Sequence, residues 1–248
     1  MAVLTKKCKR TAIGLVTGFA NGLFGSGGGT IVVPAMERFL GEEEHKAHAT
    51  AIAVILPLSL LSLGVYLWKA DLGAVWRIAF WASAGGLVGG FVGAKLLQRV
   101  SGVWLHRIFW GIHACGGSEV NLMMWGVAAI GFFSGIISGM GIGGGTILIP
   151  ALLFLTEVNQ QQAQGVNLIY FIPTAVVALI THRKNGTLDL KTAKPLALLG
   201  LAGAAAGAFL AVSLESEILK KLFGGFLLLM GLSEIFKKKK GEDTHAKR

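Results

Sequence analysis

The sequence predicts an all-α polytopic membrane protein made of two homologous repeats. Of its 248 residues, 53% are hydrophobic and 15% are charged, whereas a soluble domain usually carries about 25% charged residues. Apolar stretches close to the roughly 20 residues that one helical crossing needs recur along the chain. The tripeptide Gly-Gly-Gly also occurs twice, at 27–29 and at 143–145, each time followed by Thr-Ile.

The repeat is supported by further matching positions. The two triple glycines are 116 residues apart, and Pro57 and Pro173 have the same separation. We therefore predict a first transmembrane repeat over 11–116, a second over 120–236, and a charged cytoplasmic tail over 237–248. Internal repeats with glycine-interrupted apolar segments at matching positions are typical of transporters and indicate where the substrate binds.

Each repeat is predicted to contain one broken helix followed by three whole helices. The first break, Gly25–Gly29, separates Thr11–Phe24 from Thr30–Leu40. At about 1.5 Å per residue these pieces are roughly 21 and 16 Å long, and neither spans a core of about 30 Å alone. The second break is Gly141–Gly145. The whole helices are expected at 46–68, 74–98, 103–116, 162–182, 192–212 and 217–236.

The broken segments allow two topologies. If each segment crosses the membrane, the repeats are parallel; if each is re-entrant, the repeats are inverted. Cytoplasmic loops are enriched in Lys and Arg, and this rule favours re-entrant segments, inverted repeats and cytoplasmic N- and C-termini. The inverted arrangement places Lys69 and Arg77 outside and the following residues inside: Arg38, Lys46, Lys95, Arg99 and Arg107.

Composition also argues against several functions. The net charge of +10 comes from short basic clusters at predicted helix ends, which indicates membrane topology and not nucleic-acid binding. Cys8 and Cys115 are expected to be free thiols. The glycine run lacks the lysine of a P-loop, and no His, Cys or carboxylate set has metal-ligand spacing. We expect no catalytic residue, no metal and no cofactor.

The glycine breaks are the best candidates for a binding site. Non-helical backbone at membrane depth is tolerated only where it is buried in protein or lines a watery cavity, so two symmetric breaks should meet inside the bundle. A half-helix is expected to start after each run, at Thr30 and at Thr146. The N–H groups at a helix N-terminus attract anions. Pro34 and Pro150 each remove a further helical hydrogen bond.

The substrate-binding candidates combine these glycines with nearby polar residues. They are Asn21, Ser26, Gly27, Gly28, Gly29, Thr30, Ser138, Gly143, Gly144, Gly145, Thr146 and Asn167. His48 and Gln164 are repeat equivalents that either line the entrance of the cavity or lie solvated at the interface. Glycines at helical spacing elsewhere are expected only to pack helices: Gly85, Gly86, Gly89, Gly90, Gly93, Gly203 and Gly207.

The doubled glycine-rich break followed by Thr-Ile-[Val/Leu]-[Val/Ile]-Pro resembles the TauE/SafE family of sulfite exporters, over about Ile13 to Ile235. One departure from the family pattern is Ala51, where a hydroxyl or amide is expected and where the second repeat has Asn167. The resemblance implies export of sulfite or a small organosulfonate across the cytoplasmic (inner) membrane.

We therefore predict a transporter of a small sulfur-containing oxyanion that works by alternating access and is not an enzyme. The alternatives are a passive anion channel that uses the same breaks, and a non-transporting membrane scaffold. The expected partners are a small anionic substrate and the lipid bilayer, not nucleic acid. The oligomeric state stays open, with a homodimer as one option.

Overall fold

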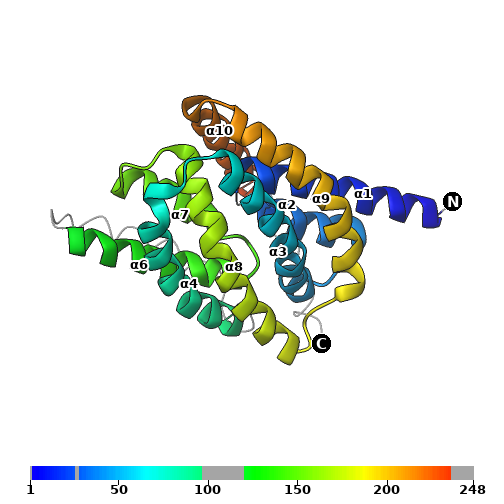
Figure 1. Ribbon diagram of the computed structural model, residues 1–248. Coiled ribbons are helices and arrows are strands. Elements are labelled where there is room, and N and C mark those ends of the chain that lie inside the picture. Colours follow the sequence, from blue (N-terminus) through cyan, green and yellow to red (C-terminus); the bar gives the residue numbers. More distant parts are fainter. Residues whose placement is uncertain (1, 26–27, 97–119, 236–248) are drawn as a thin grey trace.

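The computed structural model describes residues 2–25, 28–96 and 120–235. These residues form nine α-helices and no strand, so the predicted all-α class is confirmed for them (Figure 1). The helices are α1 (Ala2–Phe24), α2 (Gly28–Ala35), α3 (Glu44–Lys69), α4 (Trp76–Leu96), α6 (Val120–Gly139), α7 (Gly145–Leu155), α8 (Gln160–Lys184), α9 (Leu190–Ser213) and α10 (Ser216–Ile235).

The predicted helices agree with these bounds to within a few residues, with two differences. α1 begins at Ala2 and not at Thr11, because the basic residues before Thr11 continue the helix. α2 and α7 begin at Gly28 and Gly145, so the last glycines of each run belong to the first helical turn. The segment Met36–Leu40 after α2 is a π-helix. The helix predicted at 103–116, Cys115 and the tail 237–248 lie outside the described residues.

The length and composition of four described helices suit a membrane crossing: α3, α4, α8 and α9. Large apolar side chains also face outwards, for example Phe80 and Leu198, each 70% exposed. An apolar exterior of this kind is expected where lipid, and not water, surrounds the bundle.

Six of the helices fall into two parallel sets. α1 and α9 run in one direction, because Gly14 approaches Leu196 and Gly22 approaches Ala204. α3 runs with them, because Leu58 lies against Gly200 and Trp68 packs against Phe209 further along both helices. α4 and α6 run in one direction as well, with Gly85 against Ala128 and Gly93 against Ile136. α8 runs with these two, since Gly86 and Gly90 of α4 lie against Tyr170 and Thr174 in turn. α3 and α8 are antiparallel, because Tyr66 near the end of α3 bonds to Gln164 near the start of α8.

The most extensive helix contacts join distant parts of the chain, α1 with α9 and α4 with α6. Five of the glycines predicted to pack helices lie in these seams, and Gly86 and Gly90 lie against Tyr170 and Thr174 of α8. A Cβ added at Gly203 or Gly207 would collide with backbone carbonyl groups of α1, and one at Gly85, Gly89 or Gly93 would collide with those of α6. The packing role predicted for these glycines is therefore confirmed.

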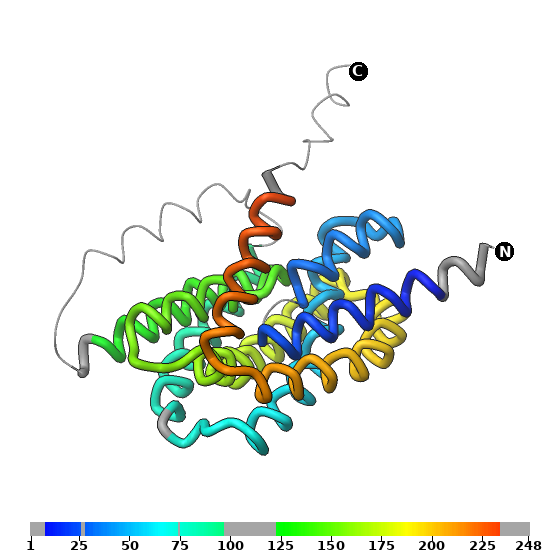
Figure 2. The backbone as a smooth tube through the Cα atoms, turned by 90° about the horizontal axis from the view of Figure 1, so that it is seen from above, coloured from blue at the N-terminus to red at the C-terminus, as the bar shows by residue number. Residues whose placement is uncertain are grey.

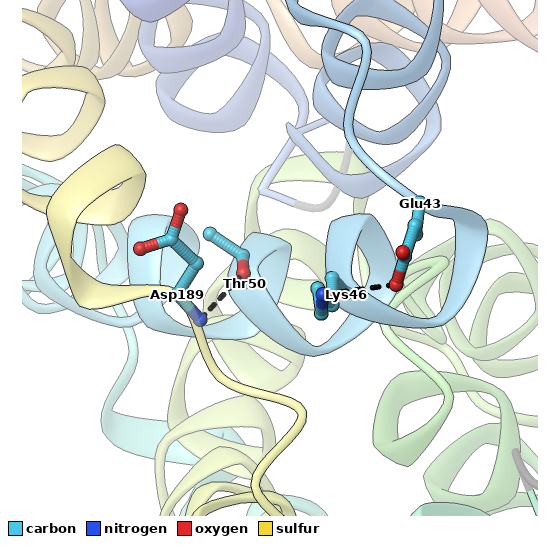
Figure 3. A network of polar contacts seen from close by, with 4 residues as sticks. All are labelled: Glu43, Lys46, Thr50 and Asp189. Carbon is cyan, nitrogen blue, oxygen red and sulfur yellow. Dashed lines mark hydrogen bonds and ion pairs between the residues drawn. The ribbon is translucent and has the colours of Figure 1, made fainter.

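One end of the bundle, where α3 and α9 begin and α4 and α8 end, is called the basic end here. The Asp189 backbone N–H, just before α9, donates to Thr50 Oγ1 of α3 at 3.1 Å. In the first turn of α3, Lys46 pairs with Glu43 at 2.9 Å (Figure 3). Lys95, Arg183, Lys184, Lys191 and Lys194 lie in the helical turns that meet this end.

Neither broken helix continues straight through the bundle. α1 enters from the basic end, and after the first glycine run α2 turns back beside it, so that the π-helix Met36–Leu40 again contacts α1 (Figure 2). The chain then enters α3 at the basic end. α6 and α7 are related in the same way at the opposite end, where α7 leads into the start of α8. Both glycine runs are thereby directed into the interior.

Candidate functional site

The two glycine breaks contact each other through their backbones. A Cβ added at Gly29 would lie 2.6 Å from the carbonyl carbon of Ile142 and 2.9 Å from the carbonyl oxygen of Gly141. Because real Cβ atoms do not approach backbone so closely, only glycine at position 29 allows this contact. Gly28, Gly29, Gly144 and Gly145 are all buried. The predicted meeting of the two breaks is therefore found in the structure.

Each break also packs against the helix that follows the other break. Gly25, with φ of +71°, lies against Gln164 of α8; Gly141, with φ of +89°, lies against His48 of α3. Such positive φ values strain any residue with a Cβ, which explains the glycines. Gly25 and Gly141 are 116 residues apart, as are His48 and Gln164. The two crossed contacts are therefore equivalent in sequence as well as in space.

An amide fixes the first break to α8. Asn167 Nδ2 donates to the carbonyl oxygen of Gly25 at 2.7 Å, and both residues are buried. The position equivalent to Asn167 in α3 is Ala51, which has no donor to offer the carbonyl of Gly141. The first break thus has a side-chain anchor for which the second has no counterpart at the matching position.

Hydroxyl groups support the second break. The Gly144 N–H donates to Ser138 Oγ at 2.8 Å, and Tyr170 of α8 donates its hydroxyl to the same oxygen at 3.2 Å. Thr146 Oγ1 donates to the carbonyl of Gly143 at 3.2 Å. Ser138 and Tyr170 therefore hold the start of α7 in place.

Asn21 occupies the corresponding place before the first break. Its Nδ2 donates to Ser59 Oγ of α3 at 3.2 Å. Its Oδ1 has no hydrogen-bond partner among the described residues and lies close to Gly28. The glycines at 14, 18 and 22 and those at 131, 135 and 139 match at a spacing of 117, which aligns Asn21 with Ser138. Each break therefore has one polar side chain from the helix that precedes it.

Gln164 brings a hydrogen-bond donor to the first break. It is fully buried, and its Oε1 accepts the hydroxyl proton of Tyr66 at 2.6 Å. Its Nε2 has no partner among the described residues. A buried amide without a partner is costly, so an N–H donor left in this position points to a ligand that accepts hydrogen bonds. Burial also removes one of the two roles predicted for Gln164, that of a solvated interfacial residue.

The structure brings together most of the predicted site residues but not all of them. Gly28, Gly29, Gly143, Gly144, Gly145, Asn21, Ser138 and Asn167 are buried at the two breaks, and Thr30 and Thr146 are half-buried in the first turns of α2 and α7. Ser26 and Gly27 lie outside the described residues. The half-helices do not begin at Thr30 and Thr146 as predicted, because the preceding glycines already have helical geometry.

Two tyrosines were not among the predicted site residues. Tyr66 and Tyr170 are the only tyrosines in the chain. Both are fully buried in apolar helices, and both donate their hydroxyl to a polar residue beside a break. Their rarity, together with their position inside membrane-length helices, is a signal that could have identified them.

An all-helical bundle with interior backbone breaks and outward apolar side chains defines a polytopic membrane protein with a buried polar site. Comparison with known sequences supports the assignment to the membrane proteins. The family model described as "Sulfite exporter TauE/SafE" matches residues 3–120 and 127–248. The chain belongs to this family of membrane transporters and is a multi-pass membrane protein.

Curated relatives have corresponding names. A "Probable membrane transporter protein" of Xylella fastidiosa (strain 9a5c) is 25% identical over 244 residues, which cover 90% of this chain and 93% of the relative. A "Probable membrane transporter protein" from Sinorhizobium sp. is 31% identical over 117 residues, covering 47% and 44%. One from Bacillus subtilis is 28% identical over 121 residues, covering 46% and 44%. No solved structure matches the chain.

Proposed function

We propose that this protein exports a small sulfur-containing oxyanion, sulfite or an organosulfonate, and that the anion binds between the two glycine breaks. The observation that carries the proposal is the backbone contact between the breaks, together with the buried Gln164 against Gly25 of the first break, whose Nε2 has no hydrogen-bond partner among the described residues. The groups around this point are amides, hydroxyls and backbone. Helix N-termini and neutral donors can hold a single negative charge without a cationic side chain.

The proposed architecture is two inverted repeats with re-entrant broken helices. It is supported by the directions of the helices. α1 and α6 are sequence equivalents that run in opposite directions, and the same is true of α3 with α8 and of α4 with α9. α2 turns back beside α1 towards the basic end. Inverted repeats that meet at broken helices near the midplane are common in secondary transporters.

We propose that the protein lies in the inner (cytoplasmic) membrane, with the basic end and both termini on the cytoplasmic side. The grouping of Lys and Arg at the basic end supports it through the positive-inside rule. In this orientation, efflux of an anion from a negative interior gains about 2.3 kcal/mol per charge per 100 mV. Export would then need no nucleotide.

Alternating access is the mechanism that we favour over a channel. The glycines at the meeting point of the breaks are buried, so an anion there needs a movement of the protein to enter or leave. Side chains of α8 hold both breaks: Asn167 donates to the carbonyl of Gly25, and Tyr170 donates to Ser138, whose oxygen also accepts from the Gly144 N–H. A movement at the breaks therefore involves these contacts with α8.

The test is counterflow of labelled sulfite in proteoliposomes, because a carrier exchanges substrate against a gradient and a simple pore does not. The informative variant is Gln164→Glu, which keeps the oxygen that Tyr66 contacts but replaces the N–H₂ donor by a second oxygen. A hydrogen bond to a charged group contributes about 1.5–3 kcal/mol, so sulfite affinity should fall by roughly 10- to 100-fold.

Ser213→Ala is the control, since Ser213 is exposed at the end of α9 and bonds only within its own helix. Saturable uptake without counterflow would favour the channel. Unchanged sulfite affinity in a folded Gln164→Glu protein would exclude the proposed binding role of Gln164.

A further inference from the structure

A surface cavity of about 440 Å³ lies at the basic end, between the last turns of α4 and α8. It is separate from the glycine breaks and is lined by Phe91, Lys95, Val177, Ile180, Thr181, Lys184 and Asn185. These residues divide into an apolar wall and a polar, cationic mouth. None of them takes part in the contacts of the breaks described above.

Two lysines on different helices supply the positive charge of this cavity. Lys95 comes from the last turn of α4, and Lys184 is the last residue of α8. The ammonium group of Lys95 lies 4.2 Å from the centre of the Phe91 ring, which holds it at the wall of the cavity. Two cations on separate helices can therefore approach one anionic group together.

The apolar wall faces outwards from the bundle. Phe91 is 44% exposed and Ile180 is 53% exposed, and Val177 lies one turn before Thr181 on the same helix. On a helix that crosses a membrane such side chains contact acyl chains. The cavity thus combines a site for a negative headgroup with a surface for hydrocarbon.

The equivalent place at the opposite end of the bundle has different chemistry. Gly93-Ala-Lys-Leu96 aligns with Gly207-Ala-Phe-Leu210, so Lys95 corresponds to Phe209 of α9. Phe209 packs edge-on against Trp68 of α3, with ring centres 6.3 Å apart. The paired lysines are therefore a property of one end of the molecule and do not follow from the helix arrangement itself.

We propose that this cavity binds an anionic phospholipid of the leaflet at the basic end, with the phosphate between Lys95 and Lys184 and one acyl chain along Phe91, Val177 and Ile180. Basic pockets between membrane helices on the cytoplasmic side bind anionic headgroups by the same chemistry. The lipid joins the end of α4 to the end of α8.

The test is native mass spectrometry of the purified full-length protein with phosphatidylglycerol and, separately, phosphatidylcholine. The wild type should retain phosphatidylglycerol preferentially. The double variant Lys95→Met/Lys184→Met should bind it about thirtyfold more weakly, as the combined effect of two lysines near one headgroup predicts. Lys95→Arg/Lys184→Arg should keep the preference, which separates loss of charge from loss of folding.

Lys69→Met is the matched control, because Lys69 also ends a membrane-length helix and lies over an aromatic ring, Trp68, at 4.5 Å. Equal phosphatidylglycerol binding by the wild type and the methionine double variant would overturn the proposal. So would equal binding of phosphatidylcholine, or displacement of phosphatidylglycerol by millimolar inorganic phosphate, which would identify a free-phosphate site instead of a lipid site.

Discussion

Replacing Gly29 by alanine tests whether the contact between the two glycine breaks is essential. The added Cβ would lie 2.6 Å from the carbonyl carbon of Ile142. An ordinary van der Waals contact of a Cβ begins near 3.4 Å, so the two breaks would have to separate by about 1 Å. The atoms that must move are backbone atoms of the second break, and no side chain can rotate away to relieve the contact.

The expected cost follows from this geometry. Overpacking a well-packed interior costs typically about 1–3 kcal/mol, and a backbone-to-backbone collision belongs near the upper value. For a chain of this size, about 3 kcal/mol lowers the melting temperature by roughly 6–12 °C. Because the proposed site lies where the breaks meet, labelled-sulfite counterflow should fall at least tenfold even at temperatures where the variant is folded.

Two other glycines provide matched comparisons. A Cβ at Gly28 would lie 3.2 Å from Ile55 Cγ1, a side-chain atom that can shift by a few tenths of an ångström. A Cβ at Gly64 of α3 would meet nothing within 4 Å. We expect Gly28→Ala to be mild and Gly64→Ala to be neutral in thermal melting and counterflow. Wild-type melting temperature and counterflow in Gly29→Ala would refute the reasoning. An equal loss of stability and counterflow in Gly28→Ala would show that the conformational freedom of the glycine backbone matters, and not the contact with the second break.

Four further predictions concern the site, the topology, the charge and the pH response. Gly144→Leu should abolish sulfite counterflow while the protein still inserts, because its side chain would displace Ser138 Oγ, 2.5 Å from the added Cβ; retained counterflow would contradict this. A cysteine at Glu43, in a background without other cysteines, should be protected from an impermeant thiol reagent added outside intact cells, and its labelling would favour crossing segments. Lys95→Met should keep measurable sulfite affinity by calorimetry, because Lys95 lies over Phe91 and outside the breaks; lost affinity in the folded variant would make Lys95 the counter-ion. Burial opposes ionisation of Asp189, but hydrogen bonds from Thr192 and the backbone N–H of Lys191 outweigh it and hold the pKa of this carboxyl below its ordinary value. The stabilisation of α9 by Asp189 is therefore present at neutral pH and lost as the pH falls through that pKa. Asp189→Asn should flatten this acid part of the profile of melting temperature against pH, and an unchanged profile would exclude the effect.

Much of the fold could be predicted because its determinants are local. Long apolar runs marked α3, α4, α8 and α9, and the glycine runs marked where α1 and α6 end. The start of α1 could not be predicted from hydropathy, since Lys and Arg are good helix formers that lower hydropathy without ending a helix. The glycine spacing predicted that the breaks meet, and Gly29 does contact the second break.

The chemistry of the site was less predictable, because it depends on which helices are neighbours. A glutamine four residues into a membrane helix has the same local sequence whether it lies at the interface or in the interior. Only the packing of α8 against the end of α3 buries Gln164 and brings Tyr66 to it. The anchor between Asn167 and Gly25 likewise joins residues 142 positions apart.

The seam between α1 and α9 has a consequence for how the chain is made. α1 begins at Ala2, and the helix that fills its glycine face ends only at Ser213. During synthesis the glycine face of α1, at Gly14, Gly18 and Gly22, is therefore without its packing partner until α9 has been made. Its helical hydrogen bonds make this possible, since a membrane helix is stable before it finds its neighbours. The seam between α1 and α9 thus closes only after the helices that lie between them in the chain have been made.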